Sequence, residues 1–261
     1  MSARLGRRAF GAVLAGLAAC AREAPERGGD AELLVFAAAS LREVFTELAH
    51  AFERANANVR VALQCAGTQE LRAQLEHGAR ADVFASADPH HADALARAGL
   101  LEPPLPFARG GLAVVVASEA RLRIPSIAAL GEAERIVVGA RESPIGRYTE
   151  ALLERADRRF GGGLRARVEA RVVSREPSVR QVLAKVRLGE ADAGIVYASD
   201  LVGLEDIVAI PIPPELDVVV TYPIARVVRA ANPELAARFV ALARSEEARS
   251  VLVARGLTPT P

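Results

Sequence analysis

The stretch LLVFAAASLREVFTELAHAF, Leu33 to Phe52, decides how this chain folds. An apolar run typical of a strand stops at three alanines and a serine, and a helical pattern of apolar residues begins at once. Ser40 stands at the junction, where serine is favoured as the N-cap of a helix. A strand that passes directly into a helix is typical of a parallel sheet covered by helices. It also places unpaired helix amides beyond the end of the strand.

The rest of the chain repeats this alternation of short apolar runs and amphipathic stretches. We predict strands at Leu33–Ala37, Val59–Gln64, Val83–Ala85, Leu112–Ala117, Ile136–Gly139, Val168–Val173, Ala193–Tyr197, Ile207–Ile212 and Val218–Val228. We predict helices at Leu41–Ala55, Gln69–His77, Pro89–Ala98, Ile127–Leu130, Arg147–Arg158, Val179–Leu188, Pro233–Arg244 and Glu246–Arg255. This order predicts an α/β fold with mixed, mostly parallel sheets and helices on both faces.

Two segments are candidates for joining domains. Leu101–Gly111 is rich in proline and glycine, and Val218–Val228 is a long β run that is broken by a proline. We therefore expect one lobe from residues 31–109 plus 222–261 and a second lobe from residues 110–221. Two crossover strands would form a hinge, and the cleft between such lobes is a natural ligand site.

The composition is that of an ordinary soluble chain. Lys and Arg number 33 and Asp and Glu number 32, so the net charge is +1, and tryptophan is absent. Neither a nucleic-acid partner nor an aromatic stacking site is therefore expected. The four histidines lack metal-ligand spacing, and the adjacent pair His90-His91 is expected to be exposed at a helix start. Cys65, alone in an apolar run, is expected to be a small core residue.

Residues 1–30 have the pattern of an export signal and a tether. MSARLGRRAF carries the positive region of a secretory signal, and GAVLAGLAAC carries an apolar core that is too short for a membrane-spanning helix. Arg7-Arg8 is compatible with the twin-arginine route as well as the general secretory (Sec) route. LAAC resembles a bacterial lipobox, so Cys20 is the predicted lipid anchor, followed by a polar tether over Ala21–Asp30. An incidental cysteine in an ordinary signal, which would leave the protein free in the periplasm, is the alternative.

Four predicted helix starts share one chemistry. They are Ser40, the pair Gly67-Thr68, the turn Ser143–Gly146, and Pro177-Ser178 before Val179. Each start leaves backbone N–H groups without partners and carries the positive end of a helix dipole. A single serine cap indicates nothing about function, because such caps normally bond to their own helix. Several starts around one point would hold an anion through neutral donors.

Three motifs in this order resemble the molybdate-binding proteins of bacterial ABC importers: FAAASL, AGTQELRAQLEHGARADVFASAD and GIVYASD. The resemblance extends from about Leu33 to near the C-terminus. It implies a two-lobed periplasmic-binding fold of type II, with two crossover hinge strands. It also implies a monomer without a cofactor, which captures molybdate or tungstate in the cleft and passes it to a membrane permease.

Position by position, this resemblance implies five contacts to the metal oxyanion. Hydroxyl groups would come from Ser40 in AAASL, Thr68 in AGTQE and Tyr197 in GIVYASD. Backbone amides would come from Ile145 in SPIG and Val179 in PSVR. Thr68 replaces the serine usual in the family, and Ile145 replaces a residue that is often alanine. Both replacements bear on the preference for molybdate over sulfate.

A site made only of donors suits an anion that carries no proton. Molybdate, tungstate and sulfate are dianions at neutral pH, whereas phosphate keeps a proton and usually needs a carboxylate acceptor. No acid lies at the matched positions, although Glu142 and Glu176 are near two of them in sequence. Asp82 is expected to be a structural acid at a strand start, and Asp88 a helix cap before Pro89.

We therefore expect a binding protein rather than an enzyme, in the periplasm or at the outer face of the cell envelope. A secreted hydrolase with Ser40 or Ser143 as nucleophile would lack a GxSxG motif and a histidine near these loops. The effector-binding domain of a cytoplasmic regulator is a third interpretation. The export signal and the lack of a DNA-binding segment argue against it. Within the same fold, a binding protein for sulfate or another small oxyanion is the alternative.

Overall fold

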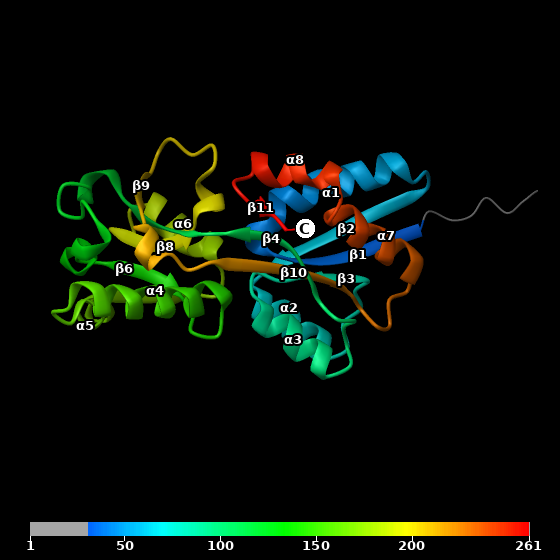
Figure 1. The fold of residues 1–261 in the computed structure, drawn as a ribbon, viewed down its shortest axis with the longest axis horizontal. Coiled ribbons are helices and arrows are strands. Elements are labelled where there is room, and N and C mark those ends of the chain that lie inside the picture. Colours follow the sequence, from blue (N-terminus) through cyan, green and yellow to red (C-terminus); the bar gives the residue numbers. More distant parts are fainter. Residues whose placement is uncertain (1–30, 261) are drawn as a thin grey trace, which may run out of the picture.

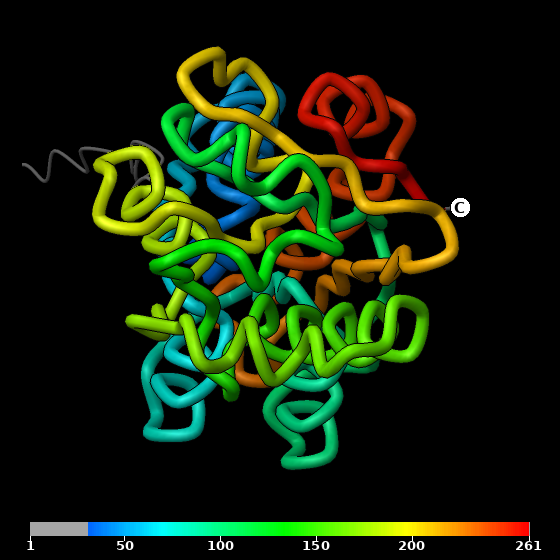
Figure 2. Tube along the Cα trace, turned by 90° about the vertical axis from the view of Figure 1, so that its left-hand side faces the viewer, coloured from blue at the N-terminus to red at the C-terminus, as the bar shows by residue number. Residues whose placement is uncertain are grey.

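The computed structural model describes residues 31–260. They form two α/β lobes that lie end to end, each built around its own sheet (Figure 1). Viewed from the end of the second lobe, the green and yellow middle of the chain stands in front of the blue and red segments from its two ends (Figure 2). The predicted export signal, tether and Cys20 lie outside the described residues.

The first sheet combines strands from both ends of the chain. In order across the sheet these are β11 (Thr258–Pro259), β4 (Leu105–Gly110), β10 (Val220–Arg226), β3 (Val83–Ala85), β1 (Ala31–Ala38) and β2 (Val59–Ala66). β1 pairs in parallel with β2 and β3, whereas β10 runs antiparallel to β3 and β4. The sheet is therefore mixed, and β10 brings the C-terminal segment of the chain back into the first lobe.

Side chains alternate along β1, and this alternation decides what covers each face of the first sheet. The helices of this lobe are α1 (Arg42–Ala55), α2 (Thr68–Glu76), α3 (Pro89–Arg97), α7 (Pro233–Ala243) and α8 (Glu246–Ala254). Leu33 and Val35 join the core under α1, α7 and α8. Phe36 points the other way and packs with Leu71 of α2 and Leu95 of α3. Both faces of β1 are thus buried.

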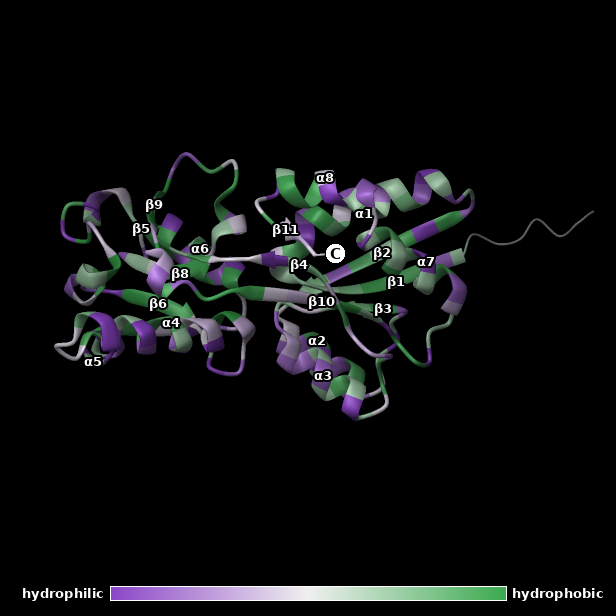
Figure 3. Cartoon of the chain, viewed as in Figure 1, coloured by the Kyte–Doolittle hydropathy of each residue, from purple (hydrophilic) through white to green (hydrophobic). Residues whose placement is uncertain are grey.

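The second sheet is built from the middle of the chain. Its strands in order are β7 (Val172–Glu176), β6 (Ile136–Gly139), β8 (Ala193–Tyr197), β5 (Leu112–Val116) and β9 (Val208–Pro211). Its helices are α4 (Pro144–Phe160), α5 (Leu164–Ala170) and α6 (Val179–Arg187). Short 3₁₀ turns are η1 (Ala39–Leu41), η2 (Ser118–Ala120), η3 (Ile127–Glu132), η4 (Ala198–Leu201) and η5 (Pro214–Leu216). Figure 3 shows β1 and β6 as hydrophobic over most of their length, as expected for central strands.

Two connections join the lobes. The chain passes from β4 through Gly111 into β5, and it returns from η5 into β10 (Figure 1). Both connections are extended and lie side by side, since β4 and β10 are paired up to Gly110 and Val220. The α/β, two-lobed fold class expected from the sequence is confirmed.

Several elements differ from the predictions, and the predicted helix Ile127–Leu130 is part of the 3₁₀ turn η3. The segment 164–170 is helix α5, so the predicted strand Val168–Val173 is wrong in its first half, and the strand is Val172–Glu176. Leu164 and Val168 are spaced four apart and both are fully buried, which favours a helix over a strand here. The proline-rich segment read as a linker contains β4 (Leu105–Gly110), which pairs with β10 across a bulge.

The acids and histidines near the lobe boundary are only partly as expected. Asp88 caps α3 by accepting from the His91 amide at 3.1 Å, as predicted. Asp82 accepts from the Leu34 amide at 2.8 Å, so it is a structural acid. The prediction that His91 is exposed is wrong, because its side chain is buried and its Nε2 lies 2.9 Å from the carbonyl oxygen of Glu142 in the other lobe.

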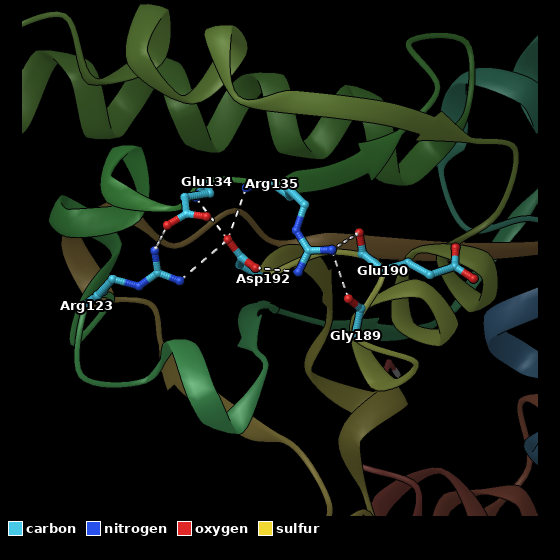
Figure 4. Close-up of polar contacts among 6 residues, drawn as sticks. All are labelled: Arg123, Glu134, Arg135, Gly189, Glu190 and Asp192. Carbon is cyan, nitrogen blue, oxygen red and sulfur yellow. Dashed lines mark hydrogen bonds and ion pairs between the residues drawn. The ribbon is translucent and has the colours of Figure 1, made fainter.

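Asp192 fastens the start of β8 to the start of β6 (Figure 4). Its Oδ2 accepts from the amides of Glu134 and Arg135 at 2.9 and 3.1 Å, and its Oδ1 accepts from the Arg135 guanidinium at 2.9 Å. Arg123 lies 3.8 Å from Oδ2. Burial raises the pKa of Asp192, but the hydrogen bonds from Arg135 and Glu134 outweigh it and hold the pKa below its ordinary value.

We expect Asp192→Asn to lower the free energy of unfolding by about 1–3 kcal/mol at neutral pH, because bonds to a buried charge are lost. The folded pKa is depressed, so the contribution of Asp192 is complete above the unfolded pKa and disappears as pH falls through the folded pKa. Urea unfolding at several pH values measures both effects, with the exposed Glu132→Gln as control. A difference between variant and wild type that does not shrink in acid would contradict this role.

Candidate ligand-binding site

Four helix starts meet in a small pocket between the lobes. The pocket has a volume of about 20 Å³. Its lining is Ala38, Ala39, Ser40, Ala66, Gly67, Thr68, Ala87, Ser143, Pro144, Ile145, Pro177, Ser178, Val179 and Tyr197. All five residues predicted to bind a ligand are among them, from both lobes. Their roles as ligand contacts stay a prediction.

Ser40 differs from the expected N-cap. It lies inside the 3₁₀ turn η1, and the N-cap of α1 is Leu41, which makes no side-chain cap bond. The chain tightens into this turn before the α-helix begins, so the cap position shifts by one residue. The Ser40 Oγ is buried and has no hydrogen-bond partner among the described residues. A buried hydroxyl in this state costs about 1–3 kcal/mol, so it is poised to bond to a ligand.

Thr68 begins α2 and is 2% exposed. Its Oγ1 accepts from the Ala87 amide at 3.3 Å, which occupies a lone pair and leaves the hydroxyl proton free to be donated. The preceding amide, that of Gly67, is already bonded to the Glu70 carboxylate at 3.0 Å. The hydroxyl of Thr68 is therefore the side-chain donor that α2 presents to the pocket.

The starts of α4 and α6 present backbone amides. Ser143 caps α4 by accepting from the Gly146 amide at 3.1 Å and donating to the Ala140 carbonyl at 2.7 Å. The next residue is Pro144, which has no N–H, so Ile145 carries the first amide of α4. Among residues 31–260, no acceptor is bonded to the amides of Ile145 or Val179. Each helix start thus contributes to the pocket lining a residue whose N–H is unpaired among the described residues.

Tyr197 ends β8 and is both a core residue and part of the pocket wall. Its ring makes edge contacts with Tyr148 at 6.3 Å and with Tyr222 at 5.9 Å between ring centroids. Burial raises the pKa of Tyr197 well above its ordinary value, with the nearby tyrosines and Asp200 adding to the effect. The phenol therefore keeps its proton at neutral pH and can donate it.

The pocket itself carries no charge. None of its lining residues in the described chain is acidic or basic. Glu176 accepts from Ser174 at 2.7 Å and pairs with Lys185 at 2.8 Å. Glu142 contributes only its carbonyl oxygen, to His91. The arrangement can bind an anion through neutral donors, but the described lining offers no carboxylate to accept a proton from the anion.

Contacts between the lobes surround the pocket, and sequence reasoning did not find them. The Gln69 Nε2 donates to the Pro177 carbonyl at 2.7 Å, and Arg147 lies 3.3 Å from the Asp88 carboxylate. Arg180 in the first turn of α6 pairs with Glu43 of α1. No local pattern signals such contacts, because they depend on how the two lobes face each other.

One buried acid lies behind this boundary. Asp200 is 3.8 Å from the Arg180 guanidinium, and its carboxylate oxygens have no hydrogen-bond partner in the described chain. Burial raises the pKa of Asp200 to about 7, although Arg180 acts in the opposite direction. Asp200 does not line the ligand pocket and instead faces a second cavity of about 130 Å³, which Ser40 also lines.

Two α/β lobes that are joined by paired strands, with neutral donors from both lobes lining the pocket between them, have the architecture of a solute-binding protein. The chain belongs to the bacterial extracellular solute-binding protein family, whose model matches residues 33–258. This family places it outside the cytoplasmic membrane. In the described part of the chain, no helix has both the length and the apolar character that a membrane crossing requires.

Known relatives agree with this assignment. Molybdate-binding protein ModA of Mycobacterium tuberculosis is 36% identical over 249 residues, which cover 92% of each chain. ModA of Haemophilus influenzae is 27% identical over 237 residues, covering 87% of this chain and 90% of that protein. The predicted resemblance is thereby confirmed.

Solved structures share the fold. The periplasmic molybdate-binding protein of Azotobacter vinelandii has a TM-score of 0.73 at 20% identity and covers 88% of this chain and 99% of its own. The sulfate-binding protein SubI of Mycobacterium tuberculosis has a TM-score of 0.77 at 16% identity, with 88% and 87% covered. At these identities the likeness establishes the two-lobed architecture alone.

Gly67 permits the close approach of the lobes. A Cβ at this position would lie 2.6 Å from the Pro177 carbonyl oxygen of the other lobe. We expect Gly67→Ala to hold the lobes apart and to increase the radius of gyration in small-angle X-ray scattering. Gln69→Ala, which removes a bond across the cleft without adding bulk, should have a smaller effect.

The exposed Gln181→Ala on α6 serves as control and should leave the scattering curve unchanged. A Gly67→Ala protein as compact as the wild type, with or without ligand, would mean that the backbone yields at this point and that Gly67 does not limit closure.

Proposed function

We propose that this chain is the substrate-binding component of an ABC importer and captures molybdate, and also tungstate, in the cleft between its lobes. The observation that carries the proposal is the uncharged pocket in which hydroxyls and unpaired amides from four helix starts converge. The names of the Mycobacterium and Haemophilus relatives support the choice of molybdate.

The proposed mechanism is closure of the lobes around the anion. Ser40 and Thr68 belong to the first lobe, and Ile145, Val179 and Tyr197 belong to the second. A ligand that bonds to both sets stabilises the closed state relative to the open one. The hinge is proposed to lie at Gly111 on the outgoing strand and just before Val220 on the returning one, where the two sheets separate.

The absence of an acceptor in the described pocket lining favours a proton-free dianion over phosphate. Sulfate or another small oxyanion is the second candidate, because sulfate has the same charge and shape as molybdate. Thr68 and Ile145 then set the size of the pocket, since both are almost fully buried and line it. A small difference in size decides whether all donors are paired, and each buried donor left unpaired costs about 1–3 kcal/mol.

We propose binding without catalysis. The Ser143 hydroxyl is already occupied by the α4 cap. The Ser40 hydroxyl has no histidine bonded to it in the described chain. A serine nucleophile needs a base within hydrogen-bond reach, so neither serine is arranged for hydrolysis.

The proposed partner is a membrane permease that receives the anion. Cys20, if lipidated, would keep the binding protein close to that permease, since acyl chains supply membrane affinity that a single weak contact does not. We propose that the protein acts as a monomer and needs no cofactor.

The test is a calorimetric titration of the chain from Ala21 onward with molybdate, for wild type and Ser40→Ala. Wild type should bind one molybdate, and Ser40→Ala should bind it at least about 10-fold more weakly, because a hydrogen bond to a charged ligand contributes about 1.5–3 kcal/mol. Thermal melting should be almost unchanged, since Ser40 makes no bond to its own helix.

Ser126→Ala is the matched control, because Ser126 also stands at a helix start without a side-chain cap bond but is exposed and far from the pocket in sequence. Equal affinity of wild type and Ser40→Ala for molybdate would remove Ser40 from the site. No binding of molybdate by the wild type would overturn the proposed function.

A further inference from the structure

Two buried hydroxyls beside the pocket lack hydrogen-bond partners. The Oγ of Ser40 and the phenol oxygen of Tyr222 are both buried, and neither meets hydrogen-bond geometry with a partner in the described chain. Tyr222 lies on β10, is fully buried, and packs its ring against that of Tyr197 in the pocket wall. Buried polar groups normally have partners, so this pair calls for an explanation.

The two hydroxyls are neighbours. Burial raises the pKa of Tyr222 well above its ordinary value, and the hydroxyls of Ser199 and Ser40 act in the opposite direction as hydrogen-bonding groups. Geometry places the same groups together: Ser40 and Ser199 line one cavity of about 130 Å³, and the Tyr222 ring contacts that of Tyr197, which lines the ligand pocket with Ser40. The phenol keeps its proton at neutral pH and is available as a donor.

The number of protons decides how such a pair must be arranged when an anion is bound. A serine hydroxyl has one proton and two lone pairs. If Ser40 gave its proton to Tyr222, it would turn a lone pair toward the anion and repel it. If Tyr222 gives its proton to Ser40, the Ser40 proton is free to point into the pocket.

We propose that Tyr222 is a positioning residue whose hydroxyl donates to Ser40 Oγ and thereby directs the Ser40 proton to the bound oxyanion. This inference rests on the proposed function. The Ser199 hydroxyl competes for the same phenol proton in the free protein. Once Ser40 donates to a dianion, its oxygen becomes the better acceptor, because hydrogen bonds in a chain polarise one another.

Strand pairing holds the backbone of Tyr222 in place. Tyr222 is paired with Ala108 of β4, immediately before the bulge at Pro223, so two strands hold its position. These are the strands that connect the lobes. The chain of bonds from anion to Ser40 to Tyr222 therefore ends on a hinge strand and anchors the ligand to the element about which the lobes move.

A double-mutant cycle with molybdate as the probe tests the assignment. Tyr222→Phe keeps the ring and removes the hydroxyl, and it should weaken molybdate binding by about 3- to 10-fold in calorimetry. In the Ser40→Ala background, Tyr222→Phe should have no further effect, because the hydroxyl it positions is gone. In the Thr68→Ala background, Tyr222→Phe should keep its full effect on molybdate affinity, because the Thr68 hydroxyl comes from α2 and is not positioned by Tyr222.

The outcomes separate this inference from the proposed function. Failure of wild type to bind molybdate would overturn the function, and this inference with it. Binding by wild type with unchanged affinity in Tyr222→Phe would overturn the positioning role alone. An equal loss with and without the Ser40 hydroxyl would show a general packing effect and overturn it as well.

Ser199→Ala gives a second test that leaves Tyr222 intact, should Tyr222→Phe fold poorly. It removes the competing acceptor, so molybdate should bind as tightly as to wild type or more tightly. A loss as large as that expected for Tyr222→Phe would mean that the phenol acts through Ser199, and the assignment to Ser40 would be wrong.

Discussion

Four helix starts around one uncharged pocket are the arrangement on which the rest of the molecule depends. The donors come from separate β-α units: unpaired amides from Ile145 and Val179, and buried hydroxyls from Ser40 and Thr68. The two lobes must therefore face each other correctly for the donors to meet. In parallel sheets, helix N-termini lie beyond the carboxyl ends of the strands, which is where this pocket forms. The fold thus concentrates positive helix ends, and none of the described residues that line the pocket is charged.

The contacts across the cleft are weak one by one. Arg180–Glu43 is partly exposed on both sides, and such pairs contribute about 0–1 kcal/mol. In Arg147–Asp88 the carboxylate is buried, but the guanidinium is exposed to solvent. A hydrogen bond to a charged ligand contributes more, so in the proposed mechanism the bound anion rather than these pairs decides the population of the closed state. Gly67 makes room for that closure, because its missing side chain lets the Pro177 carbonyl approach.

Local sequence signals predicted much of the fold and the four helix starts, and the family resemblance supplied the five residues expected in the pocket. The continuous apolar run of β1, the cap at Asp88 and the turn into a helix at Ser143 depend only on neighbouring residues, and they formed as expected. Helix α5 was missed because a short apolar run is compatible with the period of a helix and with that of a strand. Only the burial of its side chains in the folded protein distinguishes the two. The buried state of His91 and the isolation of the Ser40 and Tyr222 hydroxyls depend on segments far apart in the chain, which no local pattern reports.

The most direct test is a crystal structure of the protein grown with molybdate, with anomalous diffraction recorded at the molybdenum edge. We expect one strong anomalous peak in the pocket, with oxygens in hydrogen-bond contact with Ser40 and Thr68 from one lobe and with the Ile145 and Val179 amides and Tyr197 from the other. A peak outside this pocket, or one in contact with a single lobe, would contradict binding by closure on a neutral set of donors.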